Sequence, residues 1–117
     1  MRTYGKCIDK KLRNGIVSIF ILISIKNRKT YPYAILMAFR KSHYEMLKRI
    51  TKNEVYNTLS SLERKGLLKH KNVSKKDTVR KQNEYVVTNE GLRVVNESKK
   101  LFLSYLEEAK KLMRELE

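Results

Sequence analysis

The stretch from Thr51 to Gly66 constrains the fold of this 117-residue chain more than any other part of its sequence. Thr51 stands three residues before Glu54, the spacing at which a Thr hydroxyl and a Glu carboxylate cap a helix N-terminus reciprocally. Apolar residues then recur at helical spacing and share one face: Val55, Leu59 and Leu62. Gly66 follows in the usual position of a helix C-terminus. The pattern predicts an amphipathic helix over residues 52–65.

Before this helix lies the most apolar run of the chain, residues 16–25, which contains no charged residue. Its β-branched content favours a strand, but the polar residues before it can form a first helical turn, and we predict a buried helix from Asp9 to about Lys26. The run is shorter than the roughly 20 residues that span a bilayer, and no signal-peptide cleavage site follows it. Together with the single cysteine, Cys7, which fits a reducing compartment, this favours a cytoplasmic protein.

Two shorter helices are predicted between these segments. Proline is tolerated in the first turn of a helix, where its fixed φ suits the helical backbone, so we expect a helix from Pro32 to about Arg40. Ser42 stands three residues before Glu45, which is the capping-box spacing again. This spacing predicts a short helix over residues 43–49.

After Gly66 the apolar pattern changes from helical to extended. Residues 67–74 and 82–87 are predicted to form two strands, and the basic polar stretch 75–81 is predicted to form the hairpin loop between them. Thr88 is then placed to cap a long final helix, with Glu90 in the first turn, where negative charge is favoured. The sequence shows no internal repeat and no second domain.

The final helix carries apolar residues at a seven-residue repeat, which is typical of helix–helix association. The repeat comprises Val95, Phe102, Tyr105, Ala109, Leu112 and Leu116. The alternative is that this helix packs only on its own domain, but about 28 residues would extend about 42 Å, beyond the width of a small domain. We therefore favour a homodimer interface, and expect a dimerisation helix over residues 89–117 that forms a single structural unit with residues 1–88.

The charge of the chain is large and unevenly distributed. There are 27 basic and 12 acidic residues, a formal net charge of +15, and the whole excess lies in residues 1–81. Residues 53–66 are neutral, whereas residues 67–81 contain six basic residues and one acidic residue. Such an excess indicates a polyanionic partner, with nucleic acid favoured over an anionic membrane because the basic residues do not line one amphipathic face.

The order helix, helix, helix, hairpin, long helix is that of a winged helix-turn-helix protein, mainly α with a small β-hairpin. In that arrangement residues 1–88 would form the DNA-binding part. The polar face of the helix over 52–65 would read base edges of double-stranded DNA, and the hairpin would contact phosphates. The candidate recognition-helix contacts are Lys52, Asn53, Tyr56, Asn57 and Ser60. The candidate wing contacts are Lys75, Lys76, Arg80 and Lys81. The alternative for both sets is an ordinary solvated surface.

Three pieces of the sequence resemble the PadR-like transcriptional regulators. Residues 53–67, NEVYNTLSSLERKGL, are similar to the recognition-helix stretch of that family. The further matching positions are Tyr33, preceded by Pro32 in place of the family glycine, and Tyr85, Thr88 and Gly91 at the end of the hairpin. The resemblance covers residues 16 to about 95. It implies a homodimeric DNA-binding regulator, often a repressor, whose C-terminal helix dimerises. Some family members respond to small molecules, but the sequence identifies no effector pocket and contains no Trp.

Other classes of function are less well supported by the residues. His43 and His70 are too far apart for zinc-ligand spacing, and no Cys cluster accompanies them, so neither a metal nor another cofactor is expected. No catalytic grouping or phosphate-binding glycine loop is visible, which argues against an enzyme. The main alternative is an architectural or coating protein that binds nucleic acid without sequence preference, using the same charge.

Overall fold

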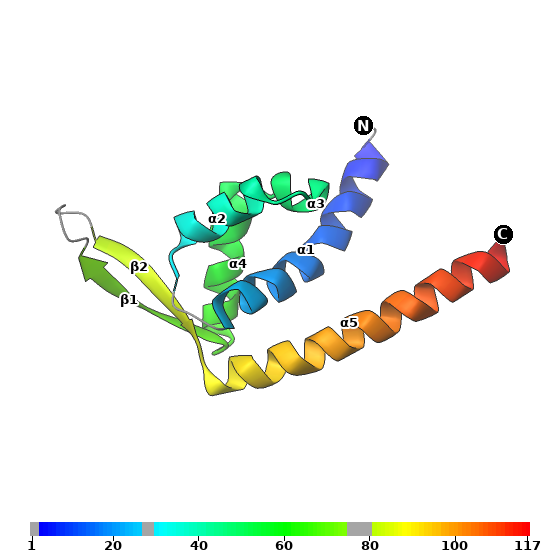
Figure 1. Ribbon diagram of the computed structural model, residues 1–117. Coiled ribbons are helices and arrows are strands. Elements are labelled where there is room, and N and C mark those ends of the chain that lie inside the picture. The colour runs from blue at the N-terminus through cyan, green and yellow to red at the C-terminus, as the bar shows by residue number, and fades with distance from the viewer. Residues whose placement is uncertain (1–2, 27–29, 75–80) are drawn as a thin grey trace.

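The computed structural model describes residues 3–26, 30–74 and 81–117, and it is mainly helical with one β-hairpin (Figure 1). The elements are α1 (Thr3–Lys26), α2 (Pro32–Lys41), α3 (Glu45–Lys48), α4 (Lys52–Arg64), β1 (Leu68–Ser74), β2 (Lys81–Val87) and α5 (Asn89–Leu116). The predicted order of elements and the predicted fold class are confirmed. The apolar run 16–25 lies inside α1, so its helical interpretation is correct.

Two predicted helix starts are wrong. The first helix begins at Thr3 rather than Asp9, because no proline interrupts the backbone before the apolar run and the helix continues through it. The short helix α3 begins at Glu45 after Tyr44, with no side-chain cap. The hydroxyl of Ser42 instead donates to the carbonyl of Phe39 at 2.8 Å, at the C-terminus of α2. Ser42 therefore ends one helix rather than starting the next.

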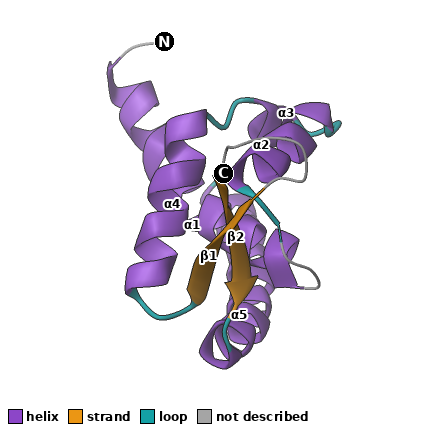
Figure 2. Cartoon of the chain, turned by 90° about the vertical axis from the view of Figure 1, so that its left-hand side faces the viewer, coloured by secondary structure: helices purple, strands orange, loops and turns teal. Residues whose placement is uncertain are grey.

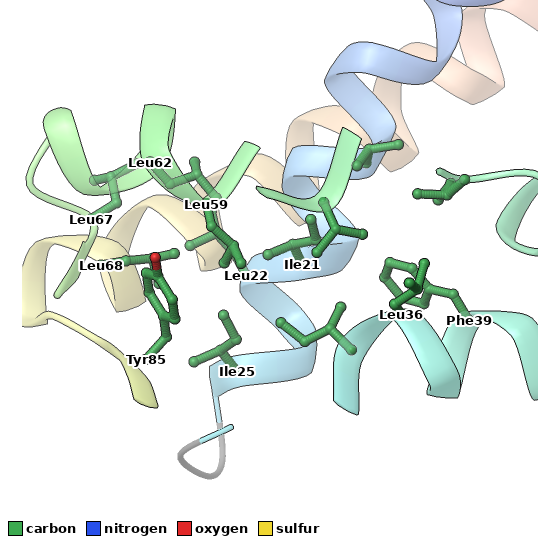
Figure 3. Close-up of a cluster of buried hydrophobic side chains, with 14 of the residues drawn as sticks. Ile21, Leu22, Ile25, Leu36, Phe39, Leu59, Leu62, Leu67, Leu68 and Tyr85 are labelled. Atoms are coloured by element: carbon green, nitrogen blue, oxygen red, sulfur yellow. The ribbon is translucent and has the colours of Figure 1, made fainter. Parts of the chain in front are cut away.

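The core lies where α1, α2 and α4 meet the base of the hairpin (Figure 3). Each of these helices is amphipathic, so its apolar face packs into the core and its polar face lies toward solvent. The buried set includes Val17, Ile21, Leu22 and Ile25 from α1, Ile35, Leu36 and Phe39 from α2, and Val55, Leu59 and Leu62 from α4. Burying an aliphatic or aromatic side chain of this size contributes about 1.5–3 kcal/mol, so this cluster fixes the position of α4.

The hairpin is antiparallel, and Leu68 pairs with Val87 at its base. Thr30 adds a short bridge to β2, because its amide and carbonyl bond the backbone of Tyr85 at 3.2 and 2.8 Å. Figure 2, viewed from the free end of the hairpin, shows α4 on one side of the two strands and α2 on the other. The hairpin is therefore attached to the helical core along one edge and at its base.

The junction between α4, the hairpin and α5 depends on two glycines. Gly66 has a φ of +79°, a left-handed conformation that ends the helix as its sequence position predicts. Thr88 caps α5 as predicted, and its hydroxyl also donates to the Gly66 carbonyl at 2.7 Å. A Cβ atom on Gly91 would lie 2.2 Å from the carbonyl oxygen of Leu67, so only glycine permits this close approach.

Helix α5 leaves the rest of the fold after its first turns (Figure 1). Of its 28 residues, only Gly91 and Val95 are buried. Exposed apolar side chains follow toward the C-terminus: Leu101, Leu103, Tyr105, Leu106, Leu112, Met113 and Leu116. Within the described ranges of the chain, none of the helices combines the length and the apolar composition that crossing a bilayer requires.

Candidate nucleic-acid interface

The outer face of α4 consists of exposed polar side chains directly opposite its buried face. All five predicted recognition-helix residues lie on this surface and are exposed: Lys52, Asn53, Tyr56, Asn57 and Ser60. The ammonium group of Lys52 lies 5.7 Å from the centre of the Tyr56 ring, within the range of a cation–π contact. Asn53 and Asn57 are both exposed on this face, and an Asn amide can pair bidentately with adenine.

The N-terminus of α4 is fixed by a network that the sequence revealed only in part. The predicted capping box is present: the Thr51 hydroxyl accepts from the Glu54 amide, and the Glu54 carboxylate accepts from the Thr51 amide. Arg13 of α1 adds bonds from one guanidinium nitrogen to both Glu54 oxygens, at 2.8 and 2.9 Å, and also contacts Asp9. The hydrogen bond to Glu54 raises the pKa of Arg13 above its ordinary value. Arg13 and Glu54 are 41 residues apart, so no local pattern indicates this pair.

The C-terminal end of α4 is tied to the hairpin by His70. Its Nδ1 lies 2.6 Å from a Glu63 carboxylate oxygen, and its ring lies 5.1 Å from the Tyr85 ring at a tilt of 40°. Burial is the main cause that raises the pKa of Tyr85. Because α4 is held at both ends, its outer face keeps a fixed orientation relative to the strands.

The described part of the hairpin presents a basic surface. Lys69 and Lys71 are exposed on β1 and line a shallow pocket of about 330 Å³ together with His70, Glu84 and Val86. The backbone of Lys81 opens β2 opposite Ser74. The predicted wing contacts Lys75, Lys76 and Arg80 lie outside the described residues, as does the side chain of Lys81.

A second hollow, of about 210 Å³, lies between the start of α2, the middle of α4 and the start of β2. Its lining residues are Tyr31, Pro32, Tyr33, Tyr56, Gln82 and Asn83. Tyr31 donates its hydroxyl to a Glu84 carboxylate oxygen at 3.3 Å, and burial followed by that carboxylate raises the pKa of Tyr31. Of these residues the sequence singled out only Tyr56 as a DNA contact, because the others come from elements that are separate along the chain.

The predicted dimerisation residues of α5 divide into two groups. Val95 is fully buried in the core of its own chain, which leaves it no surface for a partner. Phe102 and Ala109 are half-buried, and Tyr105, Leu112 and Leu116 are exposed. Phe102 and Tyr105 line an apolar groove between α1 and α5 of about 450 Å³, the α1–α5 groove, whose other lining residues are Lys11, Leu12, Gly15, Ile16, Ile19, Ser98 and Leu101.

A three-helix core, a capped helix with an exposed polar face and an adjoining basic hairpin together define a winged helix-turn-helix protein. The sequence matches the family model described as "Transcriptional regulator PadR-like family" over residues 21–97. The chain belongs to this family of DNA-binding transcriptional regulators. Its family and fold are those of transcription regulators, which are not typically enzymes. No curated protein matches the sequence significantly.

Several solved structures share the fold. A PadR family regulator from Eggerthella lenta is 23% identical, with a TM-score of 0.77 over 94% of this chain and 92% of that one. A PadR-like transcription factor from Bacteroides fragilis is 15% identical, with a TM-score of 0.73 over 90% and 97% of the two chains. A PadR-like regulator from Bacillus cereus is 17% identical, with a TM-score of 0.72 over 88% and 96%. At these identities the likeness establishes the shared fold.

Proposed function

We propose that this protein is a cytoplasmic repressor that binds a palindromic DNA site as a homodimer. The observation that carries the proposal is the outer face of α4, where exposed amide and hydroxyl side chains lie on a helix fixed at both ends. In this proposal Asn53, Asn57 and Ser60 contact base edges in the major groove, while Lys52 and Tyr56 contact bases or the adjacent backbone. Residues 75, 76, 80 and 81 would supply basic contacts to phosphates from the wing.

The dimer is supported by the apolar surface that α5 leaves open. Phe102 and Tyr105 line the α1–α5 groove, and Leu112 and Leu116 continue the exposed apolar residues toward the C-terminus. Burying exposed apolar side chains against a partner is favourable. In a two-fold dimer, the second copy would bring the same residues of its own α5 against this surface. This supports residues 1–88 as the DNA-binding part and residues 89–117 as the dimerisation helix of one unit.

Two-fold symmetry has a direct consequence for the DNA. A dimer with two equivalent α4 helices reads two half-sites related by the same axis, so the preferred site is palindromic. Repression needs no surface beyond the outer face of α4 and the dimer interface of α5, because a dimer bound to its site excludes other proteins from that DNA.

The alternative is a protein that coats nucleic acid without sequence preference, and the net charge of +15 favours it. Selection of bound sequences from a random pool of DNA duplexes separates the two functions. Enrichment of a palindromic motif is expected for the regulator. If the protein bound the duplexes but the bound sequences showed no enriched motif, the result would instead support the coating protein.

A further inference from the structure

The hollow between α2, α4 and β2 is unlike the rest of the basic surface. The six described residues that line it carry no formal charge, yet they include three tyrosines and two side-chain amides. Tyr33 is 63% exposed and Tyr56 is 41% exposed, so both phenol groups are open to a partner. The hollow therefore concentrates neutral hydrogen-bond donors on a surface that is otherwise rich in lysine.

The position of the hollow relates it to the path of DNA. A recognition helix lies in the major groove, and the wing of such a protein reaches the neighbouring minor groove. One phosphodiester strand separates these two grooves, and it must cross the protein surface between the helix and the wing. The hollow occupies that place, since Tyr56 comes from α4, while Gln82 and Asn83 come from β2. Tyr33, in the first turn of α2, closes its third side.

We infer that this hollow receives the phosphodiester strand between the two grooves, with the Tyr33 and Tyr56 hydroxyls and the Gln82 and Asn83 amides donating to its phosphate oxygens. The inference rests on the proposed docking of α4 in the major groove. Hydroxyl and amide groups are common phosphate contacts, and they set the register of a protein on the duplex without reading sequence. Lys52, stacked near the Tyr56 ring, supplies positive charge at the edge of this site.

Neutral donors leave a distinctive thermodynamic signature. Salt dependence arises because cationic side chains displace condensed counterions, and each lost cationic contact changes the log–log slope by about 0.9. A tyrosine hydroxyl displaces no counterion when it bonds a phosphate. Loss of such a contact therefore weakens binding at every salt concentration and leaves the slope unchanged.

The test compares Tyr33→Phe, Asn83→Ala and Lys52→Ala with the wild type. Affinity is measured at several salt concentrations on a duplex selected from a random pool and on a duplex of arbitrary sequence. Tyr33→Phe and Asn83→Ala are each expected to weaken binding to both duplexes by the same factor, roughly two- to tenfold, the effect of one neutral hydrogen bond. Their slopes should equal that of the wild type. Lys52→Ala should reduce the slope by about 0.9.

Tyr44→Phe is the matched control, because Tyr44 is 70% exposed and precedes α3, at the end of α2 farthest from the hairpin (Figure 1). It should bind like the wild type. Unchanged affinity of Tyr33→Phe and Asn83→Ala would overturn the inference, as would a loss confined to the selected duplex, which would show base reading instead. Failure of the wild type to bind either duplex would contradict the proposed function itself, and so is distinguishable from failure of this inference alone.

Discussion

The contact between Arg13 and Glu54 is expected to hold the recognition helix on α1, and its removal should have a measurable cost. Both side chains are partly buried, with 17% and 25% of their surface exposed. Arg13→Met keeps the aliphatic stem but removes both hydrogen bonds to the Glu54 carboxylate. Hydrogen bonds to charged groups contribute about 1.5–3 kcal/mol, so the free energy of unfolding should fall by about that amount.

A double-mutant cycle isolates the pair. Glu54→Gln preserves the cap of α4, because glutamine also serves at this position of a capping box, but it removes the charge. Chemical denaturation of the wild type, both single variants and the double variant should give a coupling energy of about 1–2 kcal/mol. This value lies between the contribution of an exposed salt bridge and that of a buried hydrogen bond to a charged group. Additive effects of the two substitutions would refute the reasoning, since they would show that the groups do not stabilise one another.

The pair between Arg93 and Glu90 on α5 is the matched control. It joins the same residue types three positions apart, but its side chains are 65% and 50% exposed. Arg93→Met should therefore change the stability by less than about 0.5 kcal/mol, because solvent screens such pairs and side-chain entropy opposes them. If Arg13→Met and Arg93→Met lowered the free energy of unfolding equally, the partial burial of the Arg13–Glu54 pair would not be the cause of its contribution to stability.

Three further predictions concern the dimer, the wing and the α5 junction. Phe102→Glu should give a monomer in sedimentation at concentrations where the wild type is a dimer, because a buried unpaired charge costs several kcal/mol; a monomeric wild type would contradict the dimer. Lys76→Ala and Arg80→Ala should weaken binding to all duplexes alike and reduce the salt slope by about 0.9 each; an unchanged slope would exclude phosphate contacts. Gly91→Ala should lower the free energy of unfolding by about 1–3 kcal/mol in denaturant titration, because its Cβ would overlap the Leu67 carbonyl; wild-type stability would contradict that close approach.

The elements that could be predicted from the sequence are those with strong local determinants. Thr51 with Glu54 defines the start of α4, Gly66 its end, and Thr88 the start of α5, because each acts within a few residues of its partner. The same spacing failed for Ser42. Local sequence does not decide whether a hydroxyl caps the following helix or bonds back to the preceding one, and here it bonds to Phe39.

Tertiary contacts account for what the sequence did not reveal. Val95 fits the seven-residue repeat of α5, yet it lies in the core because the first turns of α5 pack on the rest of the chain. Arg13 and Glu54 come together only when α1 crosses α4. The hollow beside Tyr56 combines residues from three elements, so neither charge nor periodicity indicates it.

The central claim, that the outer face of α4 reads base sequence, is tested most directly by Asn53→Ala and Asn57→Ala. Their affinities are compared on the selected duplex and on a scrambled duplex, with Asn96→Ala on α5 as the control. Each α4 variant is predicted to lose about 1–3 kcal/mol on the selected duplex, the worth of one bidentate base contact, while binding to the scrambled duplex stays unchanged. Equal losses on both duplexes would contradict the assignment of α4 as the reading helix, and would favour a protein that coats nucleic acid without sequence preference.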